Sequence, residues 1–281
     1  MTTDILTILA CPDCSGDIIR ESSRELACRG CKRIFLMVDD NIFSLLPLNS
    51  QPLPDAYSDP DYLKMSAHFD EASEYFTDGN SIFNAIQGSS HRYVSERLTA
   101  QGSAEWVCDF GCGQGFFADF FQGDPARMIG VDYRIESLRR YRARFKEPVL
   151  IQADFTRLPF KSDVIAIGVS LYALEHVYHL EDAVNEMSRV VKGGSTFYVG
   201  LPCEGGLAWT LGRKLTSERT MSKRFNLDYK KYIRLEHCNT ANEVVSALGR
   251  RFNIEHRSLY PLNILPIITA NLTISLTMTN K

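Results

Sequence analysis

The chain has 281 residues, a length that accommodates one large domain and a smaller one. Its 44% hydrophobic and 23% charged content is that of an ordinary globular protein, and its net charge of −3 argues against a general binder of polyanions. Residues 1–10 lack the basic start and long apolar run of a signal peptide, and the apolar stretch 259–278 is broken by prolines and asparagines. We therefore expect a cytoplasmic protein with reduced cysteines and no membrane partner.

Four of the eight cysteines form two C-x-x-C pairs near the start of the chain, Cys11 with Cys14 and Cys28 with Cys31. Each pair can sit on a tight turn, and two such turns bring four thiolates into the tetrahedral arrangement that Zn²⁺ prefers. A segment as short as residues 1–46 has too small a core to fold unaided, so we expect a zinc ribbon around a structural Zn²⁺. Disulfides are the alternative, and the spacing together with reducing surroundings favours zinc.

The frame around these cysteines, ILTILACP at 5–12 and NIFSLLP at 41–47, resembles two known zinc ribbons. One is the small activator subunit of some tRNA and translation-factor methyltransferases, and the other precedes the catalytic domain of certain rRNA guanine-N1 methyltransferases. The rRNA enzymes can end their site with histidine, whereas all four candidate ligands here are cysteines. Residues 1–46 carry 5 basic and 7 acidic side chains, so we favour a structural module, or one that docks a protein partner, over an RNA-binding module.

Two segments separate the ribbon from the next part of the chain. Residues 47–60 contain four prolines and are expected to form an extended linker. The segment 61–99 is expected to be helical, with breaks at Gly79 and Gly88. Its aromatic side chains either form the buried stripe of the helix or line a ligand pocket. The pocket candidates are His68, Phe69, Tyr75 and Phe76.

The stretch 106–115, WVCDFGCGQG, has the pattern of a buried strand followed by a glycine-rich turn. Asp109 closes the strand, and Gly111, Gly113 and Gly115 alternate through the turn. Glycine is needed where the backbone takes a positive φ and where a ligand packs directly on the main chain. A nucleotide-type ligand is therefore the first hypothesis, and a turn without a ligand is the alternative.

The glycine spacing distinguishes between classes of ligand. The dinucleotide-binding pattern G-x-G-x-x-G would require glycine at position 116, where the chain has Phe116 and then an apolar stretch to Phe121 suited to open a helix. An acid before the turn instead suits a ligand that carries a cationic ammonium.

Further apolar strands alternate with helical segments after this turn, which predicts a parallel sheet whose ligands bind at the carboxyl ends of the strands. Asp132 closes the next strand, 21 residues after Gly111, a separation at which a wound α/β sheet can bring a carboxylate to a ribose. Tyr133 follows and can lie against the base, and Asp154 and Ser170 fall at the ends of later strands. The expected strands are 129–132, 149–153, 164–170 and 196–200.

This succession, roughly from residue 104 to residue 201, resembles the class I S-adenosylmethionine (SAM) methyltransferases that include the ubiquinone-biosynthesis enzymes. The resemblance implies an α/β fold with a Rossmann-like seven-stranded core and SAM as the cofactor. It also implies that Asp109 approaches the methionine ammonium, that Asp154 receives the adenine amino group and that the backbone of Phe155 contacts the ring. The residues assigned to the cofactor are Asp109, Gly111, Gly113, Gly115, Asp132, Tyr133, Asp154, Phe155 and Ser170.

The methyltransferase domain is expected to cover residues 61–281, with a helical lid inserted at 201–236. Between Arg213 and Arg234 the chain has eight basic residues and two acids. Beside a catalytic cleft such a patch can steer an anionic substrate, and an exposed amphipathic helix is the alternative.

After the lid we expect a helix capped near Thr240 and a final antiparallel pair of strands. The apolar connection 260–270 would wall the acceptor pocket or form a homodimer contact. These last elements are the helix 239–250 and the strands 252–259 and 271–279.

Three residues are candidates for the catalytic side of the site. His176 follows the fourth strand and could act as a general base, with a capping or packing histidine as the alternative. Tyr172 lies closer to the strand end, and His237 stands at the end of the lid. In the ubiquinone-pathway O-methyltransferases a Glu-x-x-Glu-His segment helps to bind a divalent metal. Here Tyr172 replaces the first acid while Glu175 and His176 remain, so we assign no catalytic metal.

The expected function is SAM-dependent methyl transfer to oxygen or nitrogen of a small, anionic metabolite or sugar-type acceptor. An enzyme that modifies rRNA or tRNA with the ribbon and the basic lid is the alternative, and a nucleic-acid partner is not favoured. A third alternative is a non-catalytic SAM-binding subunit whose ribbon activates another protein.

Overall fold

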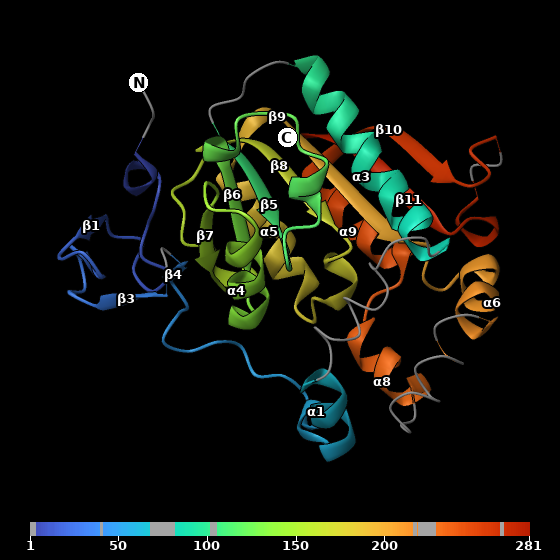
Figure 1. The fold of residues 1–281 in the computed structure, drawn as a ribbon, viewed down its shortest axis with the longest axis horizontal. Coiled ribbons are helices and arrows are strands. Elements are labelled where there is room, and N and C mark those ends of the chain that lie inside the picture. Colours follow the sequence, from blue (N-terminus) through green and yellow to red (C-terminus); the bar gives the residue numbers. More distant parts are fainter. Residues whose placement is uncertain are drawn as a thin grey trace.

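The computed structural model describes residues 4–39, 42–67, 82–101, 106–215, 218, 229–264 and 267–281. Eleven strands form one sheet in the order β1-β2-β3-β4-β7-β6-β5-β8-β9-β11-β10 (Figure 1). The expected strands are confirmed, and the last parallel one is longer than the sequence pattern indicates. The bounds are β5 (Val107–Phe110), β6 (Met128–Asp132), β7 (Val149–Gln152), β8 (Ile165–Leu171), β9 (Val191–Pro202), β10 (Phe252–Tyr260) and β11 (Thr273–Asn280).

Seven of these strands, from β7 to β10 in the sheet order, form the expected Rossmann-like core. The first five run parallel, and β11 is antiparallel to both of its neighbours, β9 and β10. The carboxyl ends of β5, β6 and β8 therefore meet at one edge of the sheet, which we call the carboxyl edge. The register places Tyr260 of β10 opposite Thr273 of β11, and Thr273 opposite Pro202 of β9, so β9 and β10 also end there.

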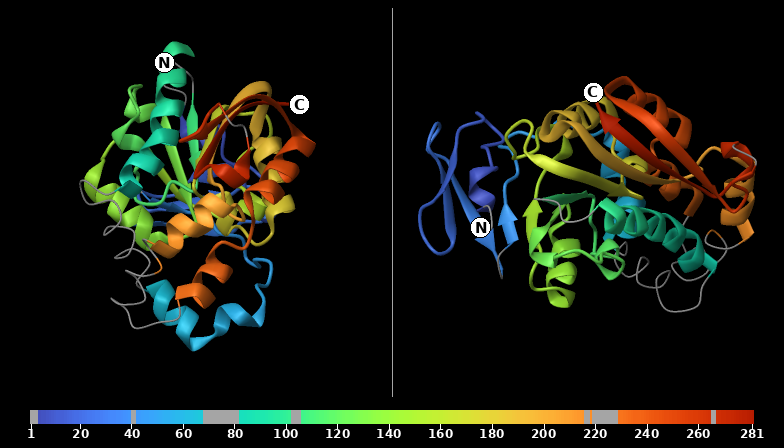
Figure 2. Two further views of the ribbon diagram at one scale, coloured as in Figure 1. Left: turned by 90° about the vertical axis from the view of Figure 1, so that its right-hand side faces the viewer. Right: turned by 90° about the horizontal axis from the view of Figure 1, so that it is seen from above.

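Helices cover both faces of the sheet. The buried side chains of α5 and α9 belong to one hydrophobic cluster, and those of α3 and α4 belong to another, so the two pairs lie on opposite faces (Figure 2). A Thr240–Glu243 capping box starts α9, as its sequence indicates. The bounds are α3 (Ile82–Gln101), α4 (Ile135–Arg144), α5 (Leu180–Val190) and α9 (Ala241–Arg251).

Two sequence expectations for helices were wrong. The break at Gly88 is absent, because α3 runs through it and buries Val94 and Leu98, which compensates for the modest cost of one helical glycine. After the glycine turn the chain makes only the 3-10 turn Phe117–Asp119. The carbonyl of Phe120 accepts a hydrogen bond from the Ser95 hydroxyl, and Pro125 soon starts another short turn. Gly79 lies outside the described residues.

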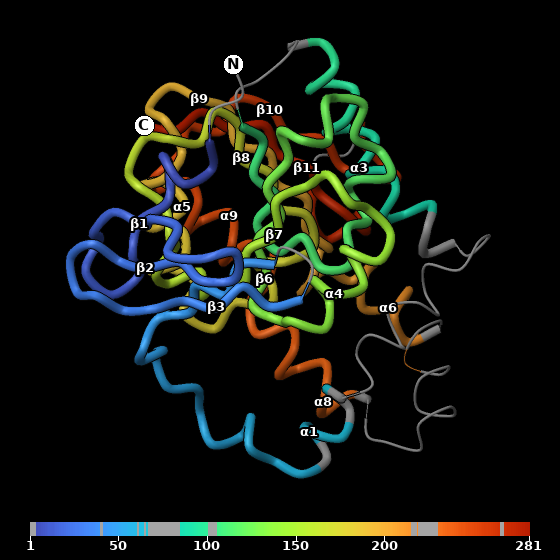
Figure 3. Tube along the Cα trace, turned by 60° about the vertical axis from the view of Figure 1, so that its left-hand side comes forward, coloured from blue at the N-terminus to red at the C-terminus, as the bar shows by residue number. Residues whose placement is uncertain are grey.

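The cysteine-bearing segment is continuous with the core. Its strands are β1 (Ile18–Arg20), β2 (Glu25–Cys28), β3 (Ile34–Val38) and β4 (Ile42–Ser44), and β4 pairs in parallel with β7. Figure 3 shows this segment in blue against the rest of the chain. Leu9 bridges Phe160, and Leu26, Phe35 and Phe160 belong to the same hydrophobic cluster as the α5 face. The segment thus shares both a sheet and a core with the larger domain.

The segment expected to be a linker leads into a helix that packs on the segment expected to be a lid. After residues 47–54 the chain forms the 3-10 turn Asp55–Ser58 and α1 (Pro60–Ala67), which packs on α8 (Tyr229–Glu236) through stacked rings of Tyr62 and Tyr232, 5.8 Å apart. Helix α6 (Leu207–Leu215) also falls within the segment 201–236 that is expected to form a lid. Within the described part of the chain, no helix is both long and apolar enough to cross a membrane.

Candidate functional site: a glycine loop and a histidine–glutamate cluster

The glycine turn after β5 has the backbone conformation that its composition predicts. Gly111, Gly113 and Gly115 have φ values of 84°, 50° and 80°. A Cβ atom on Gly111 would lie 2.2 Å from Cβ of Ala173, and one on Gly115 would lie 2.4 Å from the Tyr141 ring. A Cβ on Gly113 would meet nothing within 4 Å. The outer glycines are therefore required by packing, while Gly113 leaves open space at the carboxyl edge.

Two acids stand beside this turn. The Oδ2 of Asp132 accepts a hydrogen bond from the backbone N–H of Gly113 at 2.9 Å, and its Oδ1 accepts one from Arg134 N at 2.9 Å. Asp109 is 2% exposed, and burial together with the charge of Asp132 raises the pKa of its carboxyl to about 8. A cationic group bound here would be favoured, because it would offset both carboxylates.

The remaining residues assigned to the cofactor have different surroundings. Tyr133 is exposed, as a residue that stacks on a ligand must be. Asp154 caps a short turn by accepting hydrogen bonds from the N–H and hydroxyl of Thr156, and Phe155 lies edge-on to Phe110. The hydroxyl of Ser170 donates to the carbonyl of Phe110, so it ties β8 to β5. Ser170 is thus engaged in holding the two strands together.

Tyr172, just after β8, is held by α3. Its φ is 56°, in the left-handed region, and its hydroxyl lies 2.9 Å from the Ser90 hydroxyl. Its ring stacks on that of His91, with centroids 5.9 Å apart. His91 lies between Tyr172 and the ring of Phe120, which follows the glycine turn. The structure therefore brings α3 against Tyr172, at the end of β8.

His91 is a residue that sequence reasoning missed. Its Nδ1 donates to the carbonyl of Gln87 at 2.9 Å, which leaves the lone pair on Nε2. Burial lowers the pKa of His91 to about 4, so the ring is neutral at physiological pH. A lone histidine in a helical segment gives no sequence signal that it belongs to a functional site.

His176 is paired with an acid at the end of α8. Its Nδ1 lies 3.3 Å from Oε2 of Glu236, and its Nε2 lies 4.0 Å from Oε1 of Glu175. Burial alone would lower the pKa of His176, but Glu236 and Glu175 raise it to about 9. The pKa of Glu236 is correspondingly lowered to about 2 by His176, against the effect of its own burial. A histidine in this state is protonated at neutral pH and has no lone pair with which to accept a proton.

His237 forms a second pair beside the first. Its Nδ1 lies 2.9 Å from Oε2 of Glu204, and its ring is edge-on to that of His176 with centroids 4.8 Å apart. Glu175 is buried, and its Oε2 has no hydrogen-bond partner among the described residues. All three predicted catalytic residues thus lie near the end of β8, and the two histidines meet in one cluster. The cluster's acids, Glu175, Glu204 and Glu236, lie on three different segments.

Helix α1 reaches from the acids beside the glycine turn to the histidine–glutamate cluster. At one end the Arg134 guanidinium donates to the carbonyl of Ser66 at 2.8 Å, next to Asp132. Toward the other, the hydroxyl of Tyr62 donates to Glu236 at 2.8 Å. Helix α1 is thus hydrogen-bonded both to Arg134, beside Asp132, and to Glu236 of the histidine–glutamate cluster. The specific pocket candidates His68, Phe69, Tyr75 and Phe76 lie outside the described residues.

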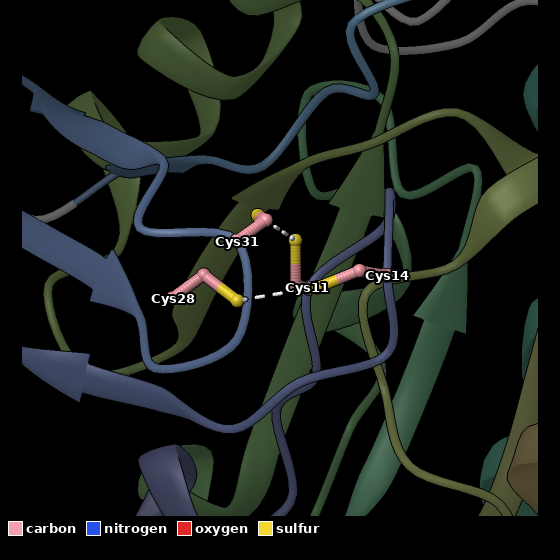
Figure 4. A group of neighbouring side chains, drawn as sticks. All are labelled: Cys11, Cys14, Cys28 and Cys31. Carbon is pink, nitrogen blue, oxygen red and sulfur yellow. Dashed lines mark hydrogen bonds between the residues drawn. The ribbon is translucent and has the colours of Figure 1, made fainter.

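The four cysteines near the start of the chain converge (Figure 4). Their sulfur atoms lie within 4.8 Å of one another, with 3.7 Å between Cys11 and Cys31 and 3.4 Å between Cys14 and Cys28. A tetrahedral zinc site with Zn–S bonds of about 2.3 Å places its sulfurs about 3.8 Å apart, and a disulfide would need about 2.05 Å. The four thiols are free, so the set fits a metal and not the disulfide alternative.

Sequence comparison relates part of this chain to methyltransferases. Residues 108–199 match the family model described as a methyltransferase domain. A "Probable S-adenosylmethionine-dependent methyltransferase" from Mycobacterium tuberculosis is 29% identical over 112 residues, which are 40% of this chain and 41% of that protein. A malonyl-[acyl-carrier protein] O-methyltransferase from Hamiltonella defensa is 27% identical over 118 residues, which are 40% of this chain and 46% of that protein. The chain thus spans less than half the length of these relatives.

Solved structures agree on the architecture. The N-methyltransferase NodS from Bradyrhizobium japonicum, in complex with S-adenosyl-L-homocysteine, matches with a TM-score of 0.53 at 12% identity, over 79% of this chain and 99% of NodS. The fold is that of a class I methyltransferase. The [4+2]-cyclase SpnF matches equally well, with a TM-score of 0.53 at 13% identity, over 83% of this chain and 99% of SpnF. Because a cyclase shares it, this methyltransferase fold alone does not define the reaction.

Proposed function

We propose that the protein transfers a methyl group from SAM to an oxygen or nitrogen atom of a small, anionic acceptor. The observation that carries the proposal is the glycine loop at the carboxyl edge, with its open space at Gly113 and the Asp132 carboxylate bonded to that residue. A loop of this kind fits a ligand that combines an ammonium with a ribose. The methyltransferase match over residues 108–199 supports SAM as that ligand.

Each half of the donor would meet different residues. Asp109 would face the ammonium, and Asp132 would exchange its bonds to backbone N–H groups for bonds to the ribose hydroxyls. The exposed ring of Tyr133 would lie on the adenine, with Asp154 and Phe155 beyond it. The sulfonium of SAM makes the methyl group electrophilic, so the residues mainly align the acceptor and exclude water.

The acceptor side holds a protonated histidine that is paired with an ionised glutamate. Because Glu236 and Glu175 keep His176 protonated, we infer that His176 offers an N–H donor to an oxygen of the acceptor and does not act as the general base. The neutral ring of His91 offers a hydrogen-bond acceptor for a hydroxyl or amine instead. In the transfer the acceptor's lone pair forms the new bond to carbon, the carbon–sulfur bond breaks with its electron pair going to sulfur, and the acceptor proton leaves to solvent.

Labelling identifies the acceptor class. The protein would be incubated with methyl-labelled SAM and separate fractions of small metabolites and RNA. We expect label in an anionic metabolite fraction, with His176→Gln raising the acceptor KM and His176→Lys preserving it. Label in RNA, with binding that weakens steeply as salt rises, would favour the RNA-modifying alternative. SAM binding without turnover on any fraction would favour a non-catalytic subunit.

Asp132→Ala is expected to weaken SAM binding by about 1–3 kcal/mol through lost carboxylate–ribose hydrogen bonds. Asp124→Ala is a matched control, because Asp124 caps a 3-10 turn through Ala126 N elsewhere on the protein. Isothermal titration calorimetry with SAM measures both. Unchanged affinity in Asp132→Ala would contradict the assigned ribose contact.

The affinity for SAM should also depend on pH through Asp109. With a pKa of about 8 its carboxyl is protonated at pH 6, and binding an ammonium requires its ionised form, so a proton must be released. We expect affinity to rise from pH 6 to pH 8 by up to about tenfold per unit, and the rise to vanish in Asp109→Asn. Calorimetry in two buffers of different ionisation enthalpy measures how many protons are released when SAM binds. If no proton were released at pH 6.5, the assignment of Asp109 to the ammonium would be contradicted.

We further propose that Cys11, Cys14, Cys28 and Cys31 bind a structural Zn²⁺. The two glycines beside them support this, because a Cβ on Gly16 would lie 3.0 Å from Sγ of Cys28 and one on Gly30 would lie 3.2 Å from Sγ of Cys14. Such a site implies a reducing compartment, which the cytoplasm provides. The ribbon would have no catalytic role.

A further inference from the structure

Residues 149–161, which we call the base segment, carry the side chains that the proposed function assigns to adenine. The base segment consists of β7, then Asp154, then the 3-10 turn Phe155–Arg157 that Asp154 caps, and the residues after it. The cysteine-bearing segment contacts the base segment at both ends. Strand β4 pairs in parallel with β7 (Figure 1), and Lys161 N donates to the carbonyl of Ile8 at 2.9 Å. The part of the donor site expected to receive adenine is therefore attached on both sides to the cysteine-bearing segment.

The attachment at the end of the base segment is a short antiparallel contact. Leu9 bridges Phe160, and Ala10 N donates to the carbonyl of Pro159 at 3.0 Å. Leu9 and Phe160 are both buried, so apolar packing supports the backbone hydrogen bonds. Cys11 follows Ala10 directly, and this contact is therefore continuous with the first C-x-x-C turn.

A pair of side-chain hydrogen bonds, which we call the relay, lies at the other attachment. The hydroxyl of Ser44, the last residue of β4, donates to Oε1 of Gln152 at 2.8 Å. The Nε2 of Gln152 in turn donates to the carbonyl of Tyr133 at 3.0 Å. Because this carbonyl can only accept, the Gln152 amide must present its N–H group there, and its oxygen then faces Ser44. Ser44 therefore orients the amide that holds the backbone of Tyr133.

The backbone of Tyr133 is important because its side chain is 57% exposed, so packing does little to fix the ring. The carbonyl of the preceding residue, Asp132, accepts a hydrogen bond from Ala153 N at 3.0 Å, so the base segment also holds the backbone at the ribose acid. A ligand binds more tightly to groups that are already in place, because less conformational entropy is lost on binding. The relay therefore bears on the affinity for the adenosine part of the donor.

We propose that the cysteine-bearing segment is a positioning element of the donor site and that it acts through Gln152. Ser44 orients the Gln152 amide, Gln152 holds the Tyr133 backbone, and the two attachments fix the base segment. This inference rests on the proposed function, which places the adenosine part of SAM against Asp132, Tyr133 and the base segment. Ser44 and Gln152 would touch none of the reacting atoms, so they are positioning residues.

Amide hydrogen exchange on the full chain without any ligand tests whether the relay holds the Tyr133 backbone. We expect exchange in the peptides 129–135 and 149–155 to be faster in Ser44→Ala and in Gln152→Met, by about three- to tenfold. Ser44→Thr keeps a hydroxyl and should exchange as the original protein does. If exchange in these peptides were unchanged in both of the first two variants, the relay would be refuted.

Calorimetry with S-adenosyl-L-homocysteine tests the role of the relay in donor binding. We expect Ser44→Ala and Gln152→Met to bind it about three- to tenfold more weakly, and Ser44→Thr to restore the original affinity. Because Ser44 acts through Gln152, the double variant should lose no more affinity than Gln152→Met alone, and additive losses would overturn the relay. The fold-loss should be equal for 5′-methylthioadenosine, which lacks the amino-acid part, and an unchanged affinity for that compound would exclude a role at the adenosine.

Ser188→Ala is the matched control, because Ser188 takes part in the same kind of relay away from the donor site. Its hydroxyl donates to Oδ1 of Asn280 at 2.8 Å, and Nδ2 of Asn280 donates to the carbonyl of Val191 at 2.7 Å. Val191 begins β9, so this relay lies at the opposite edge of the sheet from the glycine loop.

We expect Ser188→Ala to lower the melting temperature about as much as Ser44→Ala does, while its affinity for S-adenosyl-L-homocysteine stays unchanged. Equal losses of affinity in the two variants would reduce the effect of Ser44 to general destabilisation and would overturn the positioning role. Binding that Ser44→Ala leaves intact would contradict only this role. An original protein that binds neither compound would contradict the proposed function itself.

Discussion

Replacing Cys28 by serine is expected to unfold the ribbon and to free β4 from β7. Cys28 is buried, and it is one of four thiols whose geometry fits a single Zn²⁺. Structural zinc sites contribute about 10–16 kcal/mol in isolated finger peptides, which is as large as the total stability of a typical domain, about 5–15 kcal/mol. Loss of one ligand therefore removes a large stabilising contribution, and the core contacts of Leu26 and Phe35 are what remain to hold the segment.

Metal analysis, limited proteolysis and thermal melting measure this effect. We expect about one zinc per original chain, a large loss of zinc in Cys28→Ser, rapid cleavage within residues 4–39 and a lower melting temperature. Cys238→Ser is the control, because Cys238 is also a free, partly buried thiol but lies outside the cluster. An original protein without metal, or a Cys28→Ser variant that melts normally, would contradict the zinc assignment.

Replacing Gly115 by alanine should damage both folding and SAM binding. Gly115 has a φ of 80°, and a Cβ there would lie 2.4 to 2.7 Å from atoms of the buried Tyr141 ring. Backbone strain costs about 1–3 kcal/mol and overpacking a further 1–3 kcal/mol, a substantial part of a domain's stability. The distorted loop would also lose its fit to the donor.

Gly113→Ala separates the two effects. Its Cβ would meet no protein atom within 4 Å, so we expect only modest destabilisation from its φ of 50°. If the donor packs on the backbone at Gly113, SAM affinity should still fall at least tenfold. Thermal melting and calorimetry on both variants check this. Normal SAM affinity in Gly113→Ala would place the ligand elsewhere.

The sequence predicts the strands well because their signals are local. The apolar runs that end in Asp109 and Asp132, and the capping box at Thr240, depend on residues close together in the chain. The helix expected after Phe116 does not form for a non-local reason, since the Ser95 hydroxyl donates a hydrogen bond to the carbonyl of Phe120. Gly88 is misleading because tertiary packing of α3 outweighs its local preference.

The acceptor side could not be predicted to the same degree. His176 and Glu236 are 60 residues apart, and only the fold brings them to 3.3 Å, which reverses the protonation state expected of a general base. His91 reaches Tyr172 through the docking of α3, and no motif marks it. The pairing of β4 with β7 likewise joins segments about 110 residues apart. Only three residues of each strand are paired, and so short a pattern does not predict which strand pairs with which.

The way in which β4 extends the sheet bears on how the protein avoids aggregating with itself. Strand β7 would otherwise present an open edge, and an open edge invites copies of a protein to pair without limit. Covering it moves the outermost position to β1, which has only three residues. At the other extremity β10 carries an irregularity between Ile254 and His256 and the charged side chains Glu255 and Arg257. Both extremities thus discourage intermolecular pairing, and the cysteine ribbon protects solubility as well as local order.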